Sequence, residues 1–368
     1  MAMSISSREQ GSLIVASQLR KARNVLQVTP QEVAKELGVD VRDVQNWETG
    51  DSEPSLKELE SLAKLYGREI DYFLADTPEP PERIRFRTAP GQALTHLSKD
   101  ARGILARFEE LCRCAWELEG LLGKRTVCHL PQFSRSTPPD GAAAGVRRSL
   151  ALRGGPIPDL KDLLQRAGVR VFQLPIPNNE FSGFSFRHAH YGACVLLNAS
   201  ELRGRRNFTL AHELAHLVYS HSPSVCSVPL SPAEPSPPLE RVANSLAVEL
   251  LLPAPQVRGD FVGRGYSTEP SRDELARMSG SWRVSMQALG YRLESLGLVR
   301  RGYTEKLVEP KPLFRPPKAP RWEGRLGKPF VQTCFEAYER QLISIGKLAH
   351  SLGIPIRKAV EEVERRGK

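Results

Sequence analysis

The sequence predicts an α+β protein with an all-α N-terminal domain, a small β-sheet followed directly by a helix that carries two histidines, and a helical C-terminal region. Capped helical segments separated by turn glycines fill residues 1–75. Apolar runs of strand length lie between residues 169 and 197, and apolar residues recur at helical spacing through much of the chain after residue 203. We expect the sheet and the histidine helix to belong to one folded unit.

A chain of 368 residues is longer than one ordinary domain requires. We expect a helical domain at 1–75 and a linker with a long helix at 76–150. The domain with the sheet and the histidine helix is expected at 151–300, and a basic helical region at 301–368.

The net charge of +10 is unevenly distributed along the chain. Residues 1–75 carry nine Lys and Arg against twelve Asp and Glu, whereas residues 290–368 carry seventeen against nine. The six cysteines are scattered without Cys-x-x-Cys spacing, which favours free thiols in a reducing compartment. There is no apolar run near the ~20 residues of a membrane helix, and residues 1–10 lack a signal-peptide core. We therefore expect a cytoplasmic protein that does not bind a membrane.

The N-terminal region has clear helix starts and stops. Thr29 to Glu32 form a capping box with proline at the first helical position, and the helix that begins there is expected to end at Gly38. Asp40 caps a helix expected at 41–48. Further helices are expected at 13–24 and after Pro54-Ser55, with apolar residues at 70–74 closing the core.

Short helices with a tight turn between the second and third follow the helix-turn-helix plan. Three stretches, Leu19 to Arg23, Thr29 to Val39 and Val44 to Gly50, resemble the Xre/phage-repressor family. The resemblance implies that residues 41–48 enter the DNA major groove. Base edges would then be read by Arg42, Gln45 and Asn46, and phosphates contacted by Arg20, Lys21 and Arg23. The acidic balance of this region leaves dimerisation or protein docking as the alternative.

The middle of the chain begins with a proline-rich linker at 75–96, which includes the basic patch Arg83 to Arg87. One long helix is expected at 97–122, which packs on the next domain or pairs with a second copy in a homodimer. Residues 131–145 are rich in Pro, Ser, Ala and Gly and are expected to be exposed.

A small α/β unit is expected after residue 159. Its predicted helix is 160–167, and its predicted strands are 169–174, 181–186 and 194–197. An edge of this sheet could hold an extended peptide. The proline- and serine-rich stretch from Ser220 to Pro238 is expected to be a loop, followed by a helix at 239–252.

Residues 210–217 read Leu-Ala-His-Glu-Leu-Ala-His-Leu. His212 and His216 are four apart, so both imidazoles leave the same face of a helix. This is the His-Glu-x-x-His pattern of zinc metallopeptidases, with two nitrogen ligands and Glu213 as the general base. The alternative is an amphipathic helix with two incidental histidines.

A zinc site with two histidines requires a third protein ligand. We favour Glu240, at the start of the helix at 239–252, with Asn244 one turn further to hydrogen-bond a ligand. Glu249 is the rival, but it lies on the opposite side of that helix, and Glu234 is a weaker rival in the preceding loop.

The motif at 211–217 together with Leu239-Glu-Arg-Val-Ala-Asn-Ser-Leu-Ala-Val-Glu-Leu-Leu-Leu-Pro253 resembles the ImmA/IrrE metallopeptidase family. The resemblance covers roughly residues 155–300; Leu246 stands where Phe is usual and Leu252 where Met is usual. It implies a zincin-like domain with Zn²⁺ held by His212, His216 and Glu240, and Glu213 as base. It also implies that a repressor protein is cut, which switches genes on in phage-related elements and stress responses.

The function expected from these features is a Zn²⁺-dependent endopeptidase that binds DNA and cleaves a repressor or antitoxin partner. The alternative is a DNA-binding regulator or antitoxin whose peptidase-like domain only senses or docks. Candidates for the group that stabilises the oxyanion are Tyr191, His188, His190 and His221, among which the sequence does not choose. Residues 272–298 predict two helices around a turn, and further helices are expected at 329–340, 344–352 and 355–366.

Overall fold

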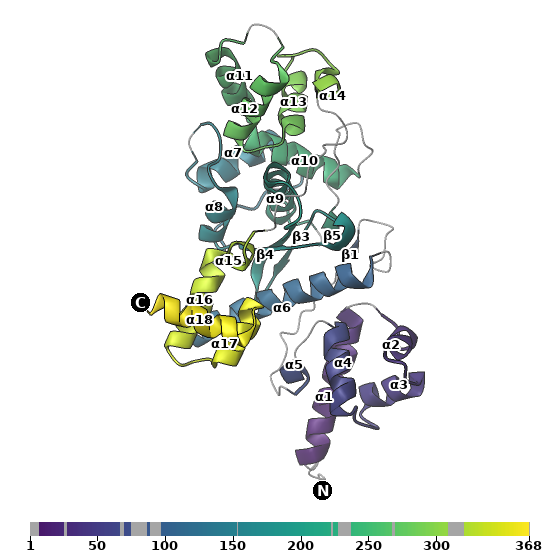
Figure 1. The fold of residues 1–368 in the computed structure, drawn as a ribbon. Coiled ribbons are helices and arrows are strands. Elements are labelled where there is room, and N and C mark those ends of the chain that lie inside the picture. The colour runs from purple at the N-terminus through teal and green to yellow at the C-terminus, as the bar shows by residue number, and fades with distance from the viewer. Residues whose placement is uncertain are drawn as a thin grey trace. The chain divides into compact units, whose positions relative to one another are not determined.

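The computed structural model (Figure 1) describes residues 7–25, 28–66, 70–74, 87–88, 97–152, 154–221, 224–226, 237–266, 269–307 and 320–367. The chain forms two compact units, Met1–Arg113 and Cys114–Lys368, and the division falls within helix α6 (Lys99–Leu121). The predicted linker at 75–96 lies outside the described residues, apart from the two-residue strand β1 (Arg87–Thr88). The long helix predicted at 97–122 is confirmed as α6.

The first unit is built from short helices, as predicted. They are α1 (Ser7–Val25), α2 (Pro30–Leu37), α3 (Val41–Thr49), α4 (Leu56–Tyr66) and α5 (Ile70–Leu74). The Thr29 hydroxyl accepts from the Glu32 backbone N–H, so the expected capping box is present. Gly38 ends α2 with φ 70°, a left-handed conformation that glycine adopts without strain. Val33, Val44, Trp47, Leu62 and Phe73 are buried in the core that these helices share.

A nearly buried ion pair ties α1 to α3. Arg23 donates from Nε and Nη2 to both carboxylate oxygens of Glu48, at 2.6 and 2.8 Å, and from Nη1 to the Val28 carbonyl. The expectation that Arg23 contacts phosphates is therefore wrong, because its guanidinium is used inside the domain. The paired Glu48 carboxylate raises the pKa of Arg23.

The second unit contains a sheet in which β5 (Ser224–Cys226), β3 (Gly183–His188), β4 (Gly192–Asn198) and β2 (Arg170–Leu174) are neighbours in that order. β4 pairs parallel with β2 and antiparallel with β3, and β3 pairs antiparallel with β5. All three predicted strands exist, although the one expected at 181–186 is shifted by two residues. The stretch expected to be a loop after Ser220 contributes strand β5, so that prediction is wrong for residues 224–226.

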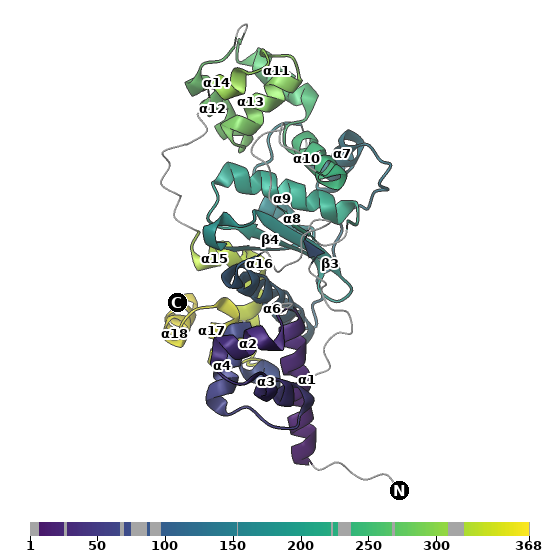
Figure 2. The ribbon, with the colours of Figure 1, turned by 90° about the vertical axis from the view of Figure 1, so that its right-hand side faces the viewer.

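Helix α9 (Arg203–Val218) crosses one face of this sheet and contacts β3 and β4 (Figure 2). Val171 and Val195 belong to the core beneath it. Successive side chains of a strand alternate between faces, and Phe172 packs edge-to-face on Phe330 of α16 (Lys328–Glu339) at 5.3 Å between ring centroids. Both faces of the sheet are therefore covered, and its strands are correspondingly apolar.

The prediction of an exposed segment at 131–145 is wrong for its second half. Residues Pro139–Ser149 form helix α7, which contacts α10 (Pro238–Leu251). Ala142, Ala143 and Val146 of α7 are fully buried. Their small side chains allow the two helices to pack closely, so a composition typical of a loop here serves a helix interface.

The remaining elements are helical. They are α8 (Leu160–Arg166), the 3-10 turn η2 (Pro177–Asn179), α11 (Ala254–Gly263), α12 (Arg272–Trp282), α13 (Met286–Ser295), α14 (Tyr303–Leu307), α15 (Trp322–Leu326), α17 (Ile345–Leu352) and α18 (Ile356–Arg366). These include the predicted helices at 160–167, 344–352 and 355–366, and the two helices predicted around a turn within 272–298. Among the helices described, none is long and apolar enough to cross a membrane. The described cysteines 112, 114, 128, 194 and 334 form no disulfide.

Candidate metal centre

Two adjacent helices bring the candidate ligands together. α9 buries one face through Leu210, Leu214 and Leu217, which are at most 3% exposed. His212 and His216 point from this helix toward α10, whose first turn carries Glu240. The pairing of the two helices is thus what converts a motif on one helix into a three-residue cluster.

The donor atoms of this cluster face a common point. His212 Nε2 lies 3.0 Å from His216 Nε2 and 3.0 Å from Glu240 Oε2. Glu240 Oε1 is 3.6 Å from His216 Nε2. Two nitrogens bound to one zinc ion at ~2.0–2.1 Å in tetrahedral geometry would lie ~3.3 Å apart, so only a small adjustment separates this geometry from that of a ligand set.

The protonation pattern also fits a cation. His212 Nδ1 is 2.8 Å from Asn244 Oδ1, an amide oxygen that only accepts, so the ring proton belongs on Nδ1 and Nε2 is free to bind a cation. Burial lowers the pKa of His212, but the Glu240 and Glu213 carboxylates raise it by more. Burial raises the pKa of Glu240, but hydrogen bonds from His212 and His216 lower it well below its usual range. The carboxylate therefore stays ionised and favours positive charge between the rings.

His221 orients the second imidazole. Its Nδ1 lies 3.0 Å from Nδ1 of His216. Burial, and then the neighbouring His216, lower the pKa of His221 to about 4, so this ring is neutral near pH 7. A neutral His221 that accepts at Nδ1 keeps the proton of His216 on Nδ1 and directs its Nε2 toward the cluster.

Glu213 lies beside the cluster and is fully buried. Its Oε2 accepts a 2.6 Å hydrogen bond from the Ser185 hydroxyl of β3, whereas its Oε1 has no hydrogen-bond partner among the described residues. Burial raises the pKa of Glu213, while the two nearby histidines lower it. One carboxylate oxygen is thus fixed in place, and the other is buried without a hydrogen-bond partner among the described residues.

A glycine allows strand β3 to come this close to α9. A Cβ placed on Gly183 would lie 2.7 Å from both Glu213 Oε1 and Thr209 Cγ2, closer than such atoms approach. Any larger residue would push the strand away and stretch the Ser185 contact. Neither Gly183 nor Ser185 was identified from the sequence; the available signal was a polar residue at a buried strand position.

The rival carboxylates lie elsewhere. Glu249 is held by Arg292, with 2.7 Å between Oε2 and Nη2, and is not part of the three-residue cluster. Glu234 lies outside the described residues.

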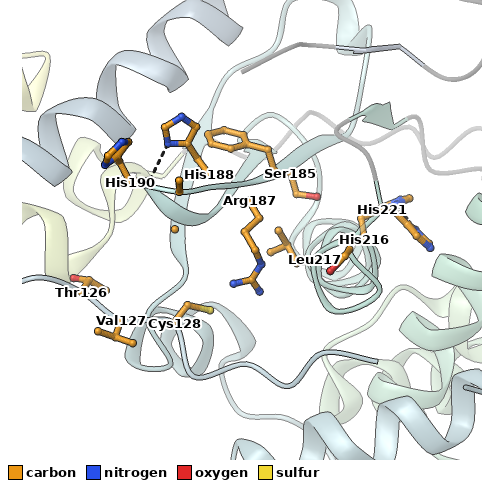
Figure 3. A pocket seen from close by; sticks show the side chains of 14 residues that line it. Thr126, Val127, Cys128, Ser185, Arg187, His188, His190, His216, Leu217 and His221 are labelled. Carbon is orange, nitrogen blue, oxygen red and sulfur yellow. Dashed lines mark hydrogen bonds between the residues drawn. The ribbon is translucent and has the colours of Figure 1, made fainter. Parts of the chain in front are cut away.

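Among the candidates for oxyanion stabilisation, Tyr191 is buried and stacks on His188, with 4.3 Å between ring centroids. His188 and His190 instead line a cavity that begins at His216 and His221 (Figure 3).

In the first unit, the residues predicted to read bases lie on α3. Arg42, Gln45 and Asn46 are all exposed, while Val44 and Trp47 on the opposite side of this helix are buried. Asp40, at the start of α3, caps the helix by accepting from the Arg42 backbone N–H. The side chains expected to reach DNA are thus free of core packing.

Comparison with known families places both features in context. Residues 164–294 match the Peptidase M78 family, described as the IrrE N-terminal-like domain, and residues 17–73 match a helix-turn-helix family. No curated protein matches the chain. The molecule is a fusion of a helix-turn-helix DNA-binding domain with a metallopeptidase-type domain. More specifically, its second half carries a domain of the Peptidase M78 family, as the sequence predicted.

Proposed function

We propose that this protein is a zinc-dependent endopeptidase of the His-Glu-x-x-His type that cleaves a transcriptional repressor or antitoxin in the cytoplasm. Cleavage switches on genes in a stress or mobile-element response. The observation that carries the proposal is the convergence of His212, His216 and Glu240 beside the partnerless carboxylate oxygen of Glu213. Two imidazoles with one carboxylate are a donor set of catalytic zinc sites.

His212 and His216 hold the ion through Nε2 and Glu240 through its carboxylate, and Asn244 orients the first of these rings. A zinc ion at this point supplies Lewis-acid chemistry, since it acidifies water and polarises a carbonyl group. Glu213 accepts a proton from the attacking water at Oε1 and passes it to the nitrogen of the leaving amine as the peptide bond breaks. The Ser185 hydroxyl holds Oε2 throughout, so that Oε1 keeps its orientation.

The helix-turn-helix domain supplies the location of the reaction. Arg42, Gln45 and Asn46 are the residues proposed to read base edges in the major groove. Bound in this way, the protein brings its peptidase domain to a substrate that is itself bound to DNA. The exposure of these side chains on α3 supports the proposal.

The test compares the zinc-loaded protein with its Glu213→Gln variant on the repressor or antitoxin encoded by a neighbouring gene. Loss of a general base lowers the rate by roughly 10²–10⁴-fold, so we expect cleavage to fall by at least about 100-fold while bound zinc, measured by plasma mass spectrometry, is retained. A Glu249→Gln control removes a carboxylate from the same pair of helices and should keep its activity. Full activity of Glu213→Gln would refute the mechanism. If the wild-type protein leaves the partner uncleaved and still binds DNA after chelation of the metal, the alternative function is favoured, a DNA-binding regulator without peptidase activity.

A further inference from the structure

A cationic cavity extends from the metal centre along strand β3 (Figure 3). Its volume is about 590 Å³. Beside His216 and His221, its polar and charged lining residues are Thr126, Cys128, Ser185, Arg187, His188, His190 and Ser220; the ring of His188 lies on the other side of β3 from Arg187 (Figure 3). No acidic side chain is among the described residues that line it. The lining therefore offers one permanent positive charge, Arg187, together with hydrogen-bonding groups, and no carboxylate among its described lining residues.

Arg187 is the permanent charge in this lining. It is two residues beyond Ser185 on β3, so both side chains leave the same face of the sheet, about 6.7 Å apart along the strand. Unlike Ser185, it is exposed, and its guanidinium projects into the cavity (Figure 3). Arg187 makes no hydrogen bond or ion pair within the described part of the chain, whereas Arg170 and Arg205 of the same domain are both paired with glutamates.

We propose that Arg187 is a specificity-determining residue, which binds a carboxylate of the peptide substrate. An extended peptide advances about 3.3 Å per residue, so the offset from Ser185 to Arg187 equals about two residues of substrate. Allowing for the reach of the arginine, the bound group is an Asp or Glu side chain one to three residues from the scissile bond. This inference rests on the proposed peptidase function and names the substrate class that it selects.

A free C-terminal carboxylate has the same chemistry, and the experiment separates the two sources. The zinc-loaded full chain is incubated with a proteome-derived peptide library, with C-termini free or amidated, and cleavage sites are read by mass spectrometry. We expect Asp and Glu to be enriched at one position within three residues of the cut in both forms of the library. Enrichment that vanishes on amidation would mean that Arg187 binds chain ends, and would overturn the side-chain assignment.

The variants make the test specific. Arg187→Gln should lower kcat/KM for an acidic reporter peptide by about 10-fold or more, the range of a charged hydrogen bond, and leave its Asn/Gln counterpart unaffected. Arg187→Glu should instead favour a lysine at that position. The control Arg203→Gln removes an exposed arginine that lies about 20 Å from His216 along α9, and it should change kcat/KM for neither peptide. Equal cleavage of acidic and neutral peptides by wild type and Arg187→Gln would overturn the proposal and leave the peptidase function standing.

A binding measurement covers the case in which no peptide is cut. Anisotropy of the labelled acidic and neutral reporter peptides is measured with the zinc-loaded Glu213→Gln variant, with and without Arg187→Gln. If the acidic peptide binds more tightly than the neutral one, and Arg187→Gln abolishes this difference, the carboxylate site is supported even when no peptide is cleaved. If both peptides bind equally, the carboxylate site is rejected.

A second inference comes from an internal repeat. Residues 344–363 align with residues 29–48 without a gap. The first fourteen aligned residues read Ser-Ile-Gly-Lys-Leu-Ala-His-Ser-Leu-Gly-Ile-Pro-Ile-Arg in the later segment. In the earlier segment they read Thr-Pro-Gln-Glu-Val-Ala-Lys-Glu-Leu-Gly-Val-Asp-Val-Arg. In both, a hydroxyl side chain caps an eight-residue helix. Each helix ends at a left-handed glycine, Gly38 with φ 70° or Gly353 with φ 62°, and the next helix begins three residues later.

Burial follows the same repeat. Val33 and Ala34 correspond to Leu348 and Ala349, all buried, and the next helices bury Val44 and Ala359 at equivalent positions. The exposed Arg42 corresponds to Arg357, whose side chain is 92% exposed. The pair α17–α18 is thus a helix-turn-helix with the same frame as α2–α3, and it lies outside both matched family segments.

We infer that α17–α18 is a second binding surface for duplex DNA. Within the aligned segments, residues 344–363 carry three Lys and Arg against two Glu, whereas residues 29–48 carry two against five Asp and Glu. Phosphate neutralisation supplies most non-specific DNA affinity, so this module has the more favourable charge of the two. Arg357 and the exposed Lys358, at the start of α18, are the cationic contacts of this module to the duplex. The 3.3 Å pair between Arg357 and Glu361 is solvent-exposed and opposes this only weakly.

The test measures the salt dependence of binding to a 30-base-pair duplex of random sequence by anisotropy. The full chain with Arg42→Ala is the background, so that the first module contributes little. Adding Arg357→Ala and Lys358→Ala should weaken binding by about 10-fold and reduce the slope of log affinity against log salt by about 2. The matched exposed pair Arg300→Ala and Arg301→Ala should change neither. If the double substitution leaves the slope unchanged, or if the background protein binds no duplex at all, the inference is overturned. If the slope is unchanged but light scattering shows that the double substitution alters the molecular mass of the protein in solution, the surface is assigned to protein contact instead.

Discussion

Ser185→Ala is the most informative perturbation of this centre, because it removes one atom that touches the proposed base but none of the donors. The Ser185 hydroxyl gives Glu213 Oε2 its 2.6 Å hydrogen bond. A hydrogen bond to a charged group is worth about 1.5–3 kcal/mol, and each 1.4 kcal/mol of barrier is a factor of ten in rate. We therefore expect kcat/KM near pH 7 to fall by about 10- to 100-fold.

The pH profile gives the second readout. The lost bond stabilised the ionised carboxylate, so its removal raises the pKa of Glu213 further above its ordinary value, in the direction that burial already sets. The base acts only when ionised, so the acidic limb of kcat/KM against pH should move to higher pH. Zinc content should not change, because Ser185 contacts no donor atom of the cluster.

The control is Ser182→Ala, which removes a hydroxyl that is also buried but lies 3.4 Å from Arg205 rather than beside Glu213. Thermal unfolding of both variants shows whether each loses a similar amount of stability. If Ser185→Ala keeps the kcat/KM of the wild type and its acidic limb stays at the same pH, the hydroxyl does not position the base. This conclusion holds whatever activity the Ser182→Ala control shows.

Three other substitutions and one control, Glu249→Gln, probe the same geometry. Glu240→Gln should lose bound zinc in plasma mass spectrometry, whereas Glu249→Gln should keep it and lose only stability; zinc retained in the first and lost in the second would reverse the ligand assignment. Asn244→Ala should weaken zinc affinity by about 10- to 100-fold in a chelator competition, since it leaves the ring of His212 without its anchor; unchanged affinity would contradict that role. Gly183→Ala should lower kcat/KM at least as much as Ser185→Ala by displacing β3, and a fully active alanine variant would show that the close approach is unnecessary.

The parts of the fold that could be predicted from the sequence are those that local chemistry decides. The Thr29 capping box and the glycine stop at Gly38 specify α2 within ten residues. His212 and His216 share a helix face by periodicity alone. Helical geometry also showed that only one of Glu240 and Glu249 can face the metal, since nine residues turn the second carboxylate away from the first.

The parts that could not be predicted depend on packing between distant segments. Residues 139–149 have a loop-like composition, and only the close approach of α7 to α10 makes their small side chains helical and buried. The contact between Ser185 and Glu213 depends on the register of β3 against β4, in which Ser185 lies opposite Val195. His221 lies beyond the end of α9, where helical periodicity no longer indicates that it returns to His216.

The centre carries a stability cost that only its chemistry explains. Among the described residues, the buried side-chain atoms without a hydrogen-bond partner include a single carboxylate oxygen, Glu213 Oε1. A buried ionised group without a partner costs more than a buried amide or hydroxyl in the same position. The neighbouring strand could have supplied a donor, as Ser185 does for Oε2, but it presents Gly183 at Oε1 instead. An acceptor kept open at this expense, next to a cluster arranged for a cation, is the arrangement expected where water must give up a proton.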